Sequence, residues 1–147
     1  MITITQHVST AHLLVNLIGV AVFAPRLMHA HGILPIALMA VIAGELANRV
    51  AAVLIDRPVI GASAAVFALA GAWLVLFPRD RTARADIALL LAVQAVFAAI
   101  APDFGGVAWI AHLLGAGLGW VVVMGVRLIA KDNAHPPRSA HEQKAKS

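Results

Sequence analysis

The chain has 147 residues, of which 61% are hydrophobic and only 12% are charged, and it contains no cysteine. Ordinary soluble domains hold roughly 45–50% apolar and about 25% charged residues, so this composition indicates an integral membrane protein. The lack of cysteine excludes disulfides, thiolate metal sites and a cysteine nucleophile. The formal net charge of +4 comes from basic residues in loops and tail, which favours an explanation by membrane topology over nucleic-acid binding.

Five apolar stretches follow one another along the chain. Most are near the ~20 residues that cross a bilayer, and they cover residues 8–23, 33–55, 59–77, 87–100 and 107–126. Prolines stand near their boundaries, as expected of residues that end helices: Pro25, Pro58, Pro78 and Pro102. We therefore expect an all-α, polytopic membrane bundle of about five transmembrane helices over residues 1–130, followed by a polar, disordered cytoplasmic tail over residues 131–147.

The basic residues predict the orientation of this bundle. With five spans, nearly all of them fall on one side of the membrane, and Arg57 alone falls in a loop on the other side. The positive-inside rule then predicts a multi-pass protein of the plasma (inner) membrane with a cytoplasmic C-terminus. In this topology His12, Ser63 and His112 each lie four or five residues inside the outer end of a helix. All three are expected at one depth, about 6–8 Å below the outer boundary.

Two of the apolar stretches carry small and polar residues on a single helical face. In the third stretch this face comprises Ser63, Phe67, Ala70 and Gly71, and in the fifth it comprises His112, Gly115 and Gly119. Small residues let membrane helices approach closely. If the two faces pack together, the Ser63 hydroxyl and a His112 nitrogen come within about 2.6–3.2 Å, as a nucleophile and its general base do.

The first stretch adds hydrogen-bond donors to this arrangement. His12 and Asn16 are four residues apart and share a face, and an imidazole or amide N–H can stabilise an oxyanion. The backbone N–H of Ser63, near the start of its helix, is a further donor. Together these groups could supply the nucleophile, the general base and the oxyanion donors of an acyl-transfer site. The acidic third residue of a catalytic triad is missing from this set. Interhelical hydrogen bonding remains an alternative role for each of these residues.

Three motifs in this order resemble the rhomboid intramembrane serine proteases: QHVSTAHLLVN, GASAAVFALAGA and AHLLGAGLG. The resemblance extends from His7 to about Gly125. It implies that Ser63 is the nucleophile and His112 the general base of a Ser-His dyad. It also implies an oxyanion hole made by His12, Asn16 and the Ser63 amide.

The resemblance also implies supporting roles and a substrate class. Gly61 would let its loop approach the substrate backbone, Phe67 would stack on the catalytic imidazole, and His7 would be interfacial or supporting. The expected substrate is a single-pass transmembrane protein, cut near the outer membrane face by an endopeptidase that needs no metal or organic cofactor. No nucleic-acid partner is expected, and the sequence predicts no oligomeric state.

Two departures from the family pattern leave an alternative open. Ala64 stands where the family often has glycine, and the chain begins at what resembles the second of six family helices. It would then be a short form lacking the first helix, a chain whose true start lies upstream, or an impaired protein. A catalytically impaired rhomboid-like pseudoprotease that binds transmembrane helices is therefore the second hypothesis. A small carrier or channel is the third, and it would use Glu45 and Arg49, which we otherwise expect to form an ion pair facing the bundle interior.

The remaining polar and aromatic residues receive simpler interpretations. Asp103 is expected to be a loop carboxylate without a catalytic role. His29 and His31 are expected in a cytoplasmic loop, where they lack further metal ligands. The tryptophans are expected to anchor at the membrane interface or to pack between helices: Trp73, Trp109 and Trp120.

Overall fold

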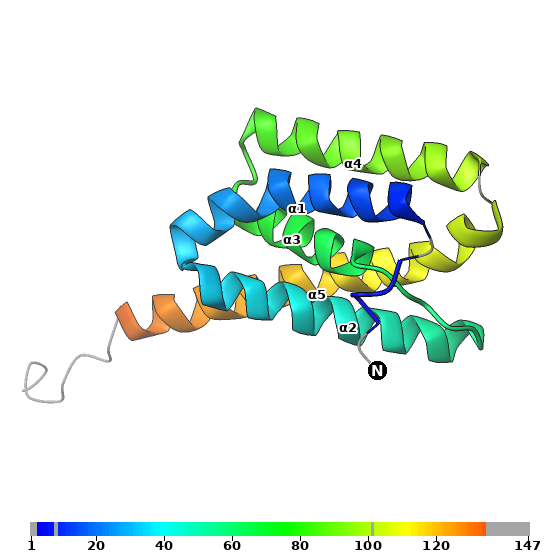
Figure 1. Ribbon diagram of the computed structural model, residues 1–147. Helices are drawn as coiled ribbons and strands as arrows, with labels where there is room; N and C mark the ends of the chain where they lie inside the picture. Colours follow the sequence, from blue (N-terminus) through cyan, green and yellow to red (C-terminus); the bar gives the residue numbers. More distant parts are fainter. Residues whose placement is uncertain (1–2, 8, 101, 135–147) are drawn as a thin grey trace, which may run out of the picture.

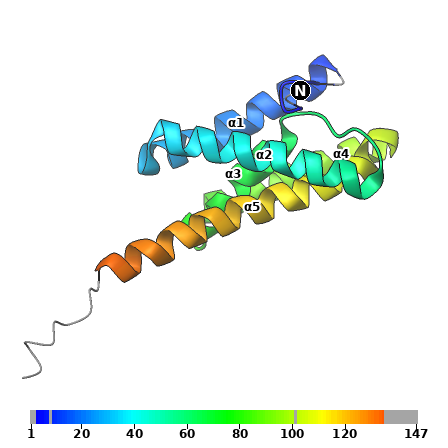
Figure 2. The same ribbon diagram turned by 90° about the horizontal axis from the view of Figure 1, so that it is seen from below.

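The computed structural model describes residues 3–7, 9–100 and 102–134, and this part of the chain is built from five helices (Figure 1). They are α1 (Thr10–His31), α2 (Ile33–Ile55), α3 (Ser63–Leu76), α4 (Arg81–Ile100) and α5 (Pro102–Ala134). Successive helices run in opposite directions, and α5 extends past the others at its C-terminal end (Figures 1 and 2). The prediction of an all-α helical membrane bundle is confirmed.

Helix α3 is the centre of the bundle. It packs most extensively against α5, and also contacts α1, α2 and α4. Nearly all of its residues are buried, as expected of a helix that is apolar on every side. Its 14 residues give a length of about 21 Å, less than the ~30 Å of a hydrocarbon core. Figure 1 shows why: the segment after α2 turns back into the bundle, and α3 begins there.

The outer surface of the bundle is apolar. Among the described residues, three segments are long and apolar enough to cross a membrane: Thr10–His31, Ile33–Ile55 and Trp109–Lys131. Large aliphatic side chains point outward from several helices, including Ile18 (63% exposed), Val53 (82%) and Leu89 (63%). Such a surface is stable when it faces lipid and costly when it faces water.

The backbones of α3 and α5 are in direct contact at three glycines. A Cβ added to any of them would overlap a carbonyl oxygen of the facing helix: Gly71 faces Ala116, Gly115 faces Ala64, and Gly119 faces Ala68. Ala70, next to Gly71, is buried in the core. This close approach is what small residues make possible in membrane helices.

The predicted helix boundaries were right for α2 and wrong for α1. Residues 33–55 form one helix as expected, but α1 continues through Pro25 to His31. A proline inside a membrane helix is tolerated when neighbouring groups satisfy the freed backbone, and α1 ends instead at Gly32, whose φ is 89°. His29 and His31 consequently lie in the last turn of α1 and not in a loop.

The later boundaries also differ from the predictions. Helix α3 starts at Ser63 instead of residue 59. Helix α4 starts at Arg81 instead of residue 87, because Asp80 Oδ1 accepts hydrogen bonds from the Thr82 and Ala83 amides at 2.8 and 3.3 Å.

Helix α5 is longer than expected at both ends. It begins at Pro102, a residue favoured in a first helical turn, and so includes Asp103, which was expected in a loop. It continues to Ala134, so residues 131–134 of the predicted tail are helical. Residues 135–147 lie outside the described part of the chain, and the disorder predicted for them stays a prediction.

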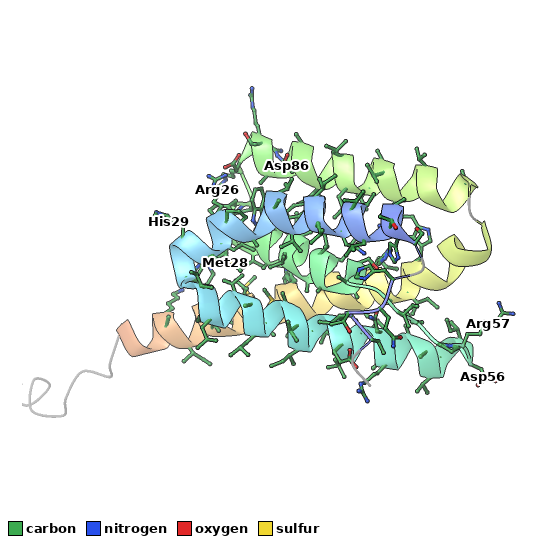
Figure 3. The ribbon with its side chains drawn as sticks, viewed as in Figure 1. Arg26, Met28, His29, Asp56, Arg57 and Asp86 are labelled. Carbon is green, nitrogen blue, oxygen red and sulfur yellow. The ribbon has the colours of Figure 1, made fainter. Side chains whose placement is uncertain are left out.

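One end of the bundle is held by polar contacts of aromatic and charged side chains. Arg26 forms an ion pair with Asp80 at 2.6 Å and lies 4.3 Å above the centroid of the Phe77 ring. Trp73 Nε1 donates to the Phe23 carbonyl at 2.8 Å, so this tryptophan packs between helices. Figure 3 shows Arg26 and His29 at this end, with Asp56 and Arg57 at the opposite end.

Candidate active site

Ser63 is the first residue of α3 and its side chain is buried, with 6% exposure. Ala62 precedes it as N-cap and provides no side-chain hydrogen bond, and the Val66 amide donates to the Ala62 carbonyl at 3.0 Å. The amide N–H groups of Ser63, Ala64 and Ala65 therefore have no hydrogen-bond acceptor within the helix. The helix dipole adds partial positive charge at the same place, so the start of α3 favours a developing negative charge.

His112 is 2% exposed and lies between two aromatic rings. Its imidazole stacks on Phe67 with centroids 4.3 Å apart and planes 6° apart, and meets Trp109 edge-on at 6.2 Å. Neither ring nitrogen has a hydrogen-bond partner among the described residues. The rings hold the imidazole plane by packing alone, and its nitrogens are not engaged in fixing the bundle.

Ser63 and His112 lie on the facing surfaces of α3 and α5. Phe67, one turn after Ser63, stacks on His112, and Gly115, one turn after His112, packs against the Ala64 carbonyl. The hydrogen bond expected between the two side chains is not formed in this structure. In enzymes without bound substrate, catalytic hydrogen bonds are often long or poorly aligned, and they tighten only in the reacting complex.

The start of α1 places His12 against the turn that precedes Ser63. Ser9 caps α1 by accepting from the His12 amide at 3.1 Å. Gly61 has a φ of 117°, and a Cβ placed on it would lie 2.6 Å from His12 Cε1. Only glycine fits here, because both the backbone conformation and the imidazole exclude a side chain. Asn16, one turn further into α1, is buried with 3% exposure.

His7 and His12 form a second aromatic pair at this end of α1. Their ring centroids are 5.4 Å apart at an interplanar angle of 64°. His7 therefore contacts a residue that contacts Gly61, and it has no ring contact with His112 among the described residues. The supporting or interfacial role expected for His7 stays a prediction.

The methyl group of Ala64 lies in an apolar cluster and not in a polar cavity. Ala64 is fully buried and packs with alanines of α2 and α5 and with one valine of the loop: Ala47, Ala51, Ala111 and Val59. The departure from glycine at this position thus fills space between three helices.

Sequence reasoning missed the residues that surround Gly61 from the other side. Asn48 of α2 and Thr3 of the N-terminal segment both hydrogen-bond here. The signal for Asn48 was present, since it is an amide in a largely apolar stretch, whereas Thr3 had none. The expected Glu45–Arg49 ion pair forms at 2.7 Å, but the Arg49 side chain is 60% exposed against 17% for Glu45, so the expectation that the pair faces the interior was wrong for Arg49.

An apolar groove lies between α1 and α4. Its walls come from aliphatic side chains on both helices, with Asp86 of α4 as the charged member (Figure 3): Val15, Ile18 and Val22 on one side, Leu89, Leu90 and Val93 on the other. Helix α1 also bears His12 and Asn16, and neither of them lines the groove. Within the described residues no group of three or more histidine, aspartate or glutamate side chains is placed to hold a metal ion.

Comparison with known protein families identifies the family of this chain. The model of the rhomboid domain matches residues 1–128, which is most of the chain. No curated protein and no solved structure matches this chain. The match includes α1, α2, α3 and α4 and the part of α5 that carries His112. The chain therefore belongs to the rhomboid family.

Proposed function

We propose that this rhomboid is an active intramembrane serine endopeptidase. The observation that carries the proposal is the position of Ser63 and His112: both are buried on facing surfaces of α3 and α5, and Phe67 links them through its stack on the imidazole. A hydroxyl and an imidazole are costly to bury in a membrane bundle without a function. The rhomboid-domain match supports a protease of this class.

In the proposed reaction, Ser63 Oγ attacks the carbonyl carbon of the scissile peptide while His112 accepts the hydroxyl proton. The resulting oxyanion is stabilised by the Ser63 amide at the start of α3, with His12 and Asn16 as side-chain donors. Collapse of the intermediate breaks the C–N bond, and His112 returns the proton to the leaving amine. Water then attacks the acyl-enzyme with His112 again as base, which releases the carboxylate product and restores Ser63.

The proposed substrate is a single-pass transmembrane protein cut near the outer face of the plasma (inner) membrane. The groove between α1 and α4 is lined mainly by aliphatic side chains, so an apolar side of a substrate helix could pack against it without exposure to water. Helix α1, which forms one wall of the groove, also bears His12 and Asn16 nearer its start, although neither of these residues lines the groove. With a cytoplasmic C-terminus, the product is released on the outer side.

The experiment is covalent labelling of purified protein in detergent with a fluorophosphonate, followed by mass spectrometry of the adduct. We expect the adduct on Ser63, and we expect Ser63→Ala and His112→Ala each to abolish both labelling and cleavage of a model transmembrane substrate. A folded wild-type protein that neither labels nor cleaves, yet binds a transmembrane helix, is the result that the pseudoprotease hypothesis predicts.

A further inference from the structure

Gly61, two residues before Ser63, is held by hydrogen bonds on both of its backbone polar groups. Its amide donates to the Thr3 carbonyl at 3.0 Å, and its carbonyl accepts from Asn48 Nδ2 at 3.0 Å. Both partners come from segments distant in the chain. The turn that leads into α3 is thus fixed by the N-terminal segment on one side and by α2 on the other.

Thr3 is in turn held by α2. The Glu45 Oε2 carboxylate oxygen accepts from the Thr3 amide at 2.8 Å and from the Thr3 hydroxyl at 2.9 Å. The Thr3 hydroxyl also accepts from Asn48 Nδ2 at 3.0 Å. Hydrogen bonds to a charged carboxylate are about twice as strong as those between neutral groups. One threonine therefore joins Glu45, Asn48 and Gly61 in a closed network.

The burial of Asn48 argues for a specific role of this network. Asn48 is 1% exposed, and its amide nitrogen makes both of its hydrogen bonds to groups that adjoin the proposed site. A buried amide in a membrane helix is costly and usually functional. His12 also packs closely against this turn, since a Cβ built on Gly61 would lie 2.6 Å from His12 Cε1.

We infer that Glu45, Asn48 and Thr3 are positioning residues, which clamp Gly61 and thereby fix Ser63 and its amide relative to His12. This inference rests on the proposed protease function. The clamp touches neither substrate nor reacting atoms, and it acts through the backbone of the turn. Since a displacement of about 1 Å in a catalytic group costs on the order of 10²-fold in rate, loosening the turn should lower the chemical rate and not substrate binding.

The test compares Thr3→Val with Thr3→Ser. Valine keeps the β-branched shape but loses the hydroxyl that contacts Glu45 and Asn48, whereas serine keeps it. We expect Thr3→Val to lower the rate of fluorophosphonate labelling per folded molecule, and kcat, by roughly tenfold or more with KM unchanged. Thr3→Ser should restore most of the rate. Asn48→Leu, which removes both amide donations, should behave as Thr3→Val does.

Trp73→Phe is the control for a general loss of stability. It removes one buried hydrogen bond, to the Phe23 carbonyl, at the other end of α3. It should lower the Tm in detergent while leaving the labelling rate of folded protein unchanged. Equal labelling rates in Thr3→Val and wild type would overturn the inference, as would an equal loss of rate in Trp73→Phe.

Hydrogen exchange of the Gly61 amide, read by NMR of glycine-labelled protein, tests the clamp without catalysis. We expect slow exchange in the wild type and faster exchange in Thr3→Val and Asn48→Leu. If exchange at Gly61 is slower in the wild type than in the two variants, but the wild type never labels at Ser63, the proposed function fails and the clamp stands. If exchange at Gly61 is the same in all variants, the clamp itself is refuted, whatever the labelling result.

Discussion

The Phe67 ring lies parallel to the His112 imidazole, with 4.3 Å between centroids and 6° between planes. Phe67 is one helical turn from Ser63, so the ring that orients the base stands on the same face as the nucleophile. The imidazole has no hydrogen bond to fix its plane within the described residues. Its orientation therefore depends on aromatic packing from α3 and from Trp109.

We expect Phe67→Leu to lower kcat strongly and to lower the stability of the bundle only slightly. Leucine fills most of the volume but cannot stack, so the imidazole gains freedom and the proton transfer slows by roughly 10²-fold. The measurement is kcat and KM with a transmembrane substrate, together with the rate of Ser63 labelling. Phe23→Leu is the control for the labelling rate, which needs no bound substrate helix, because Phe23 is also buried but packs edge-on against Trp73. If both variants lose the same activity, Phe67 is an ordinary core residue.

The glycines between α3 and α5 predict a second set of outcomes. Gly115→Ala and Gly119→Ala should each destabilise the bundle by about 1–3 kcal/mol, because the added methyl group overlaps a backbone carbonyl that cannot rotate away. Thermal unfolding in detergent measures the effect. Gly117→Ala and Gly125→Ala are controls on the same helix, since a Cβ at either meets nothing within 4 Å. They should be neutral, or stabilising by up to about 1 kcal/mol through helix propensity.

A third prediction concerns pH at the end of the bundle that holds Arg26. The Arg26 hydrogen bond, with the Ala83 and Thr82 amides, lowers the pKa of Asp80 below its ordinary value of 3.8. A lowered folded-state pKa contributes stability above the unfolded pKa, and this contribution is lost as pH falls through the folded value. Asp80→Asn keeps the cap of α4 but loses the ion pair, so it should lower the Tm slightly at neutral pH.

The difference between wild type and Asp80→Asn should shrink in acid, as pH falls below about 3.8. Thermal melts from neutral pH to pH 3 provide the measurement. Because the pair is partly exposed, raising the salt concentration should also reduce the difference. A gap in Tm that stays constant over the whole pH range would show that the Arg26–Asp80 pair contributes nothing.

Some features of this fold could be predicted from the sequence and others could not, for physical reasons. The spacing of the small residues indicated which faces of α3 and α5 could pack closely, because residues four apart on one helix share a face, but the packing itself was only a condition of the prediction. The course of α1 through Pro25 was missed, since the sequence alone does not show which neighbours stabilise a proline-containing turn. The Thr3–Glu45–Asn48–Gly61 network joins three separate segments, so no local pattern indicates it.

Ala64→Gly addresses the choice between protease and pseudoprotease. Because the Ala64 methyl group packs with Ala47, Ala51 and Ala111, its removal leaves a small void and adds backbone freedom within α3. Stability should fall by about 1–2 kcal/mol, from one lost buried carbon and the poor helix propensity of glycine. The labelling rate per folded molecule at Ser63 should not rise, since the methyl group lies between helices. A many-fold gain of labelling in Ala64→Gly would mean that alanine impairs the natural site, as the pseudoprotease hypothesis requires.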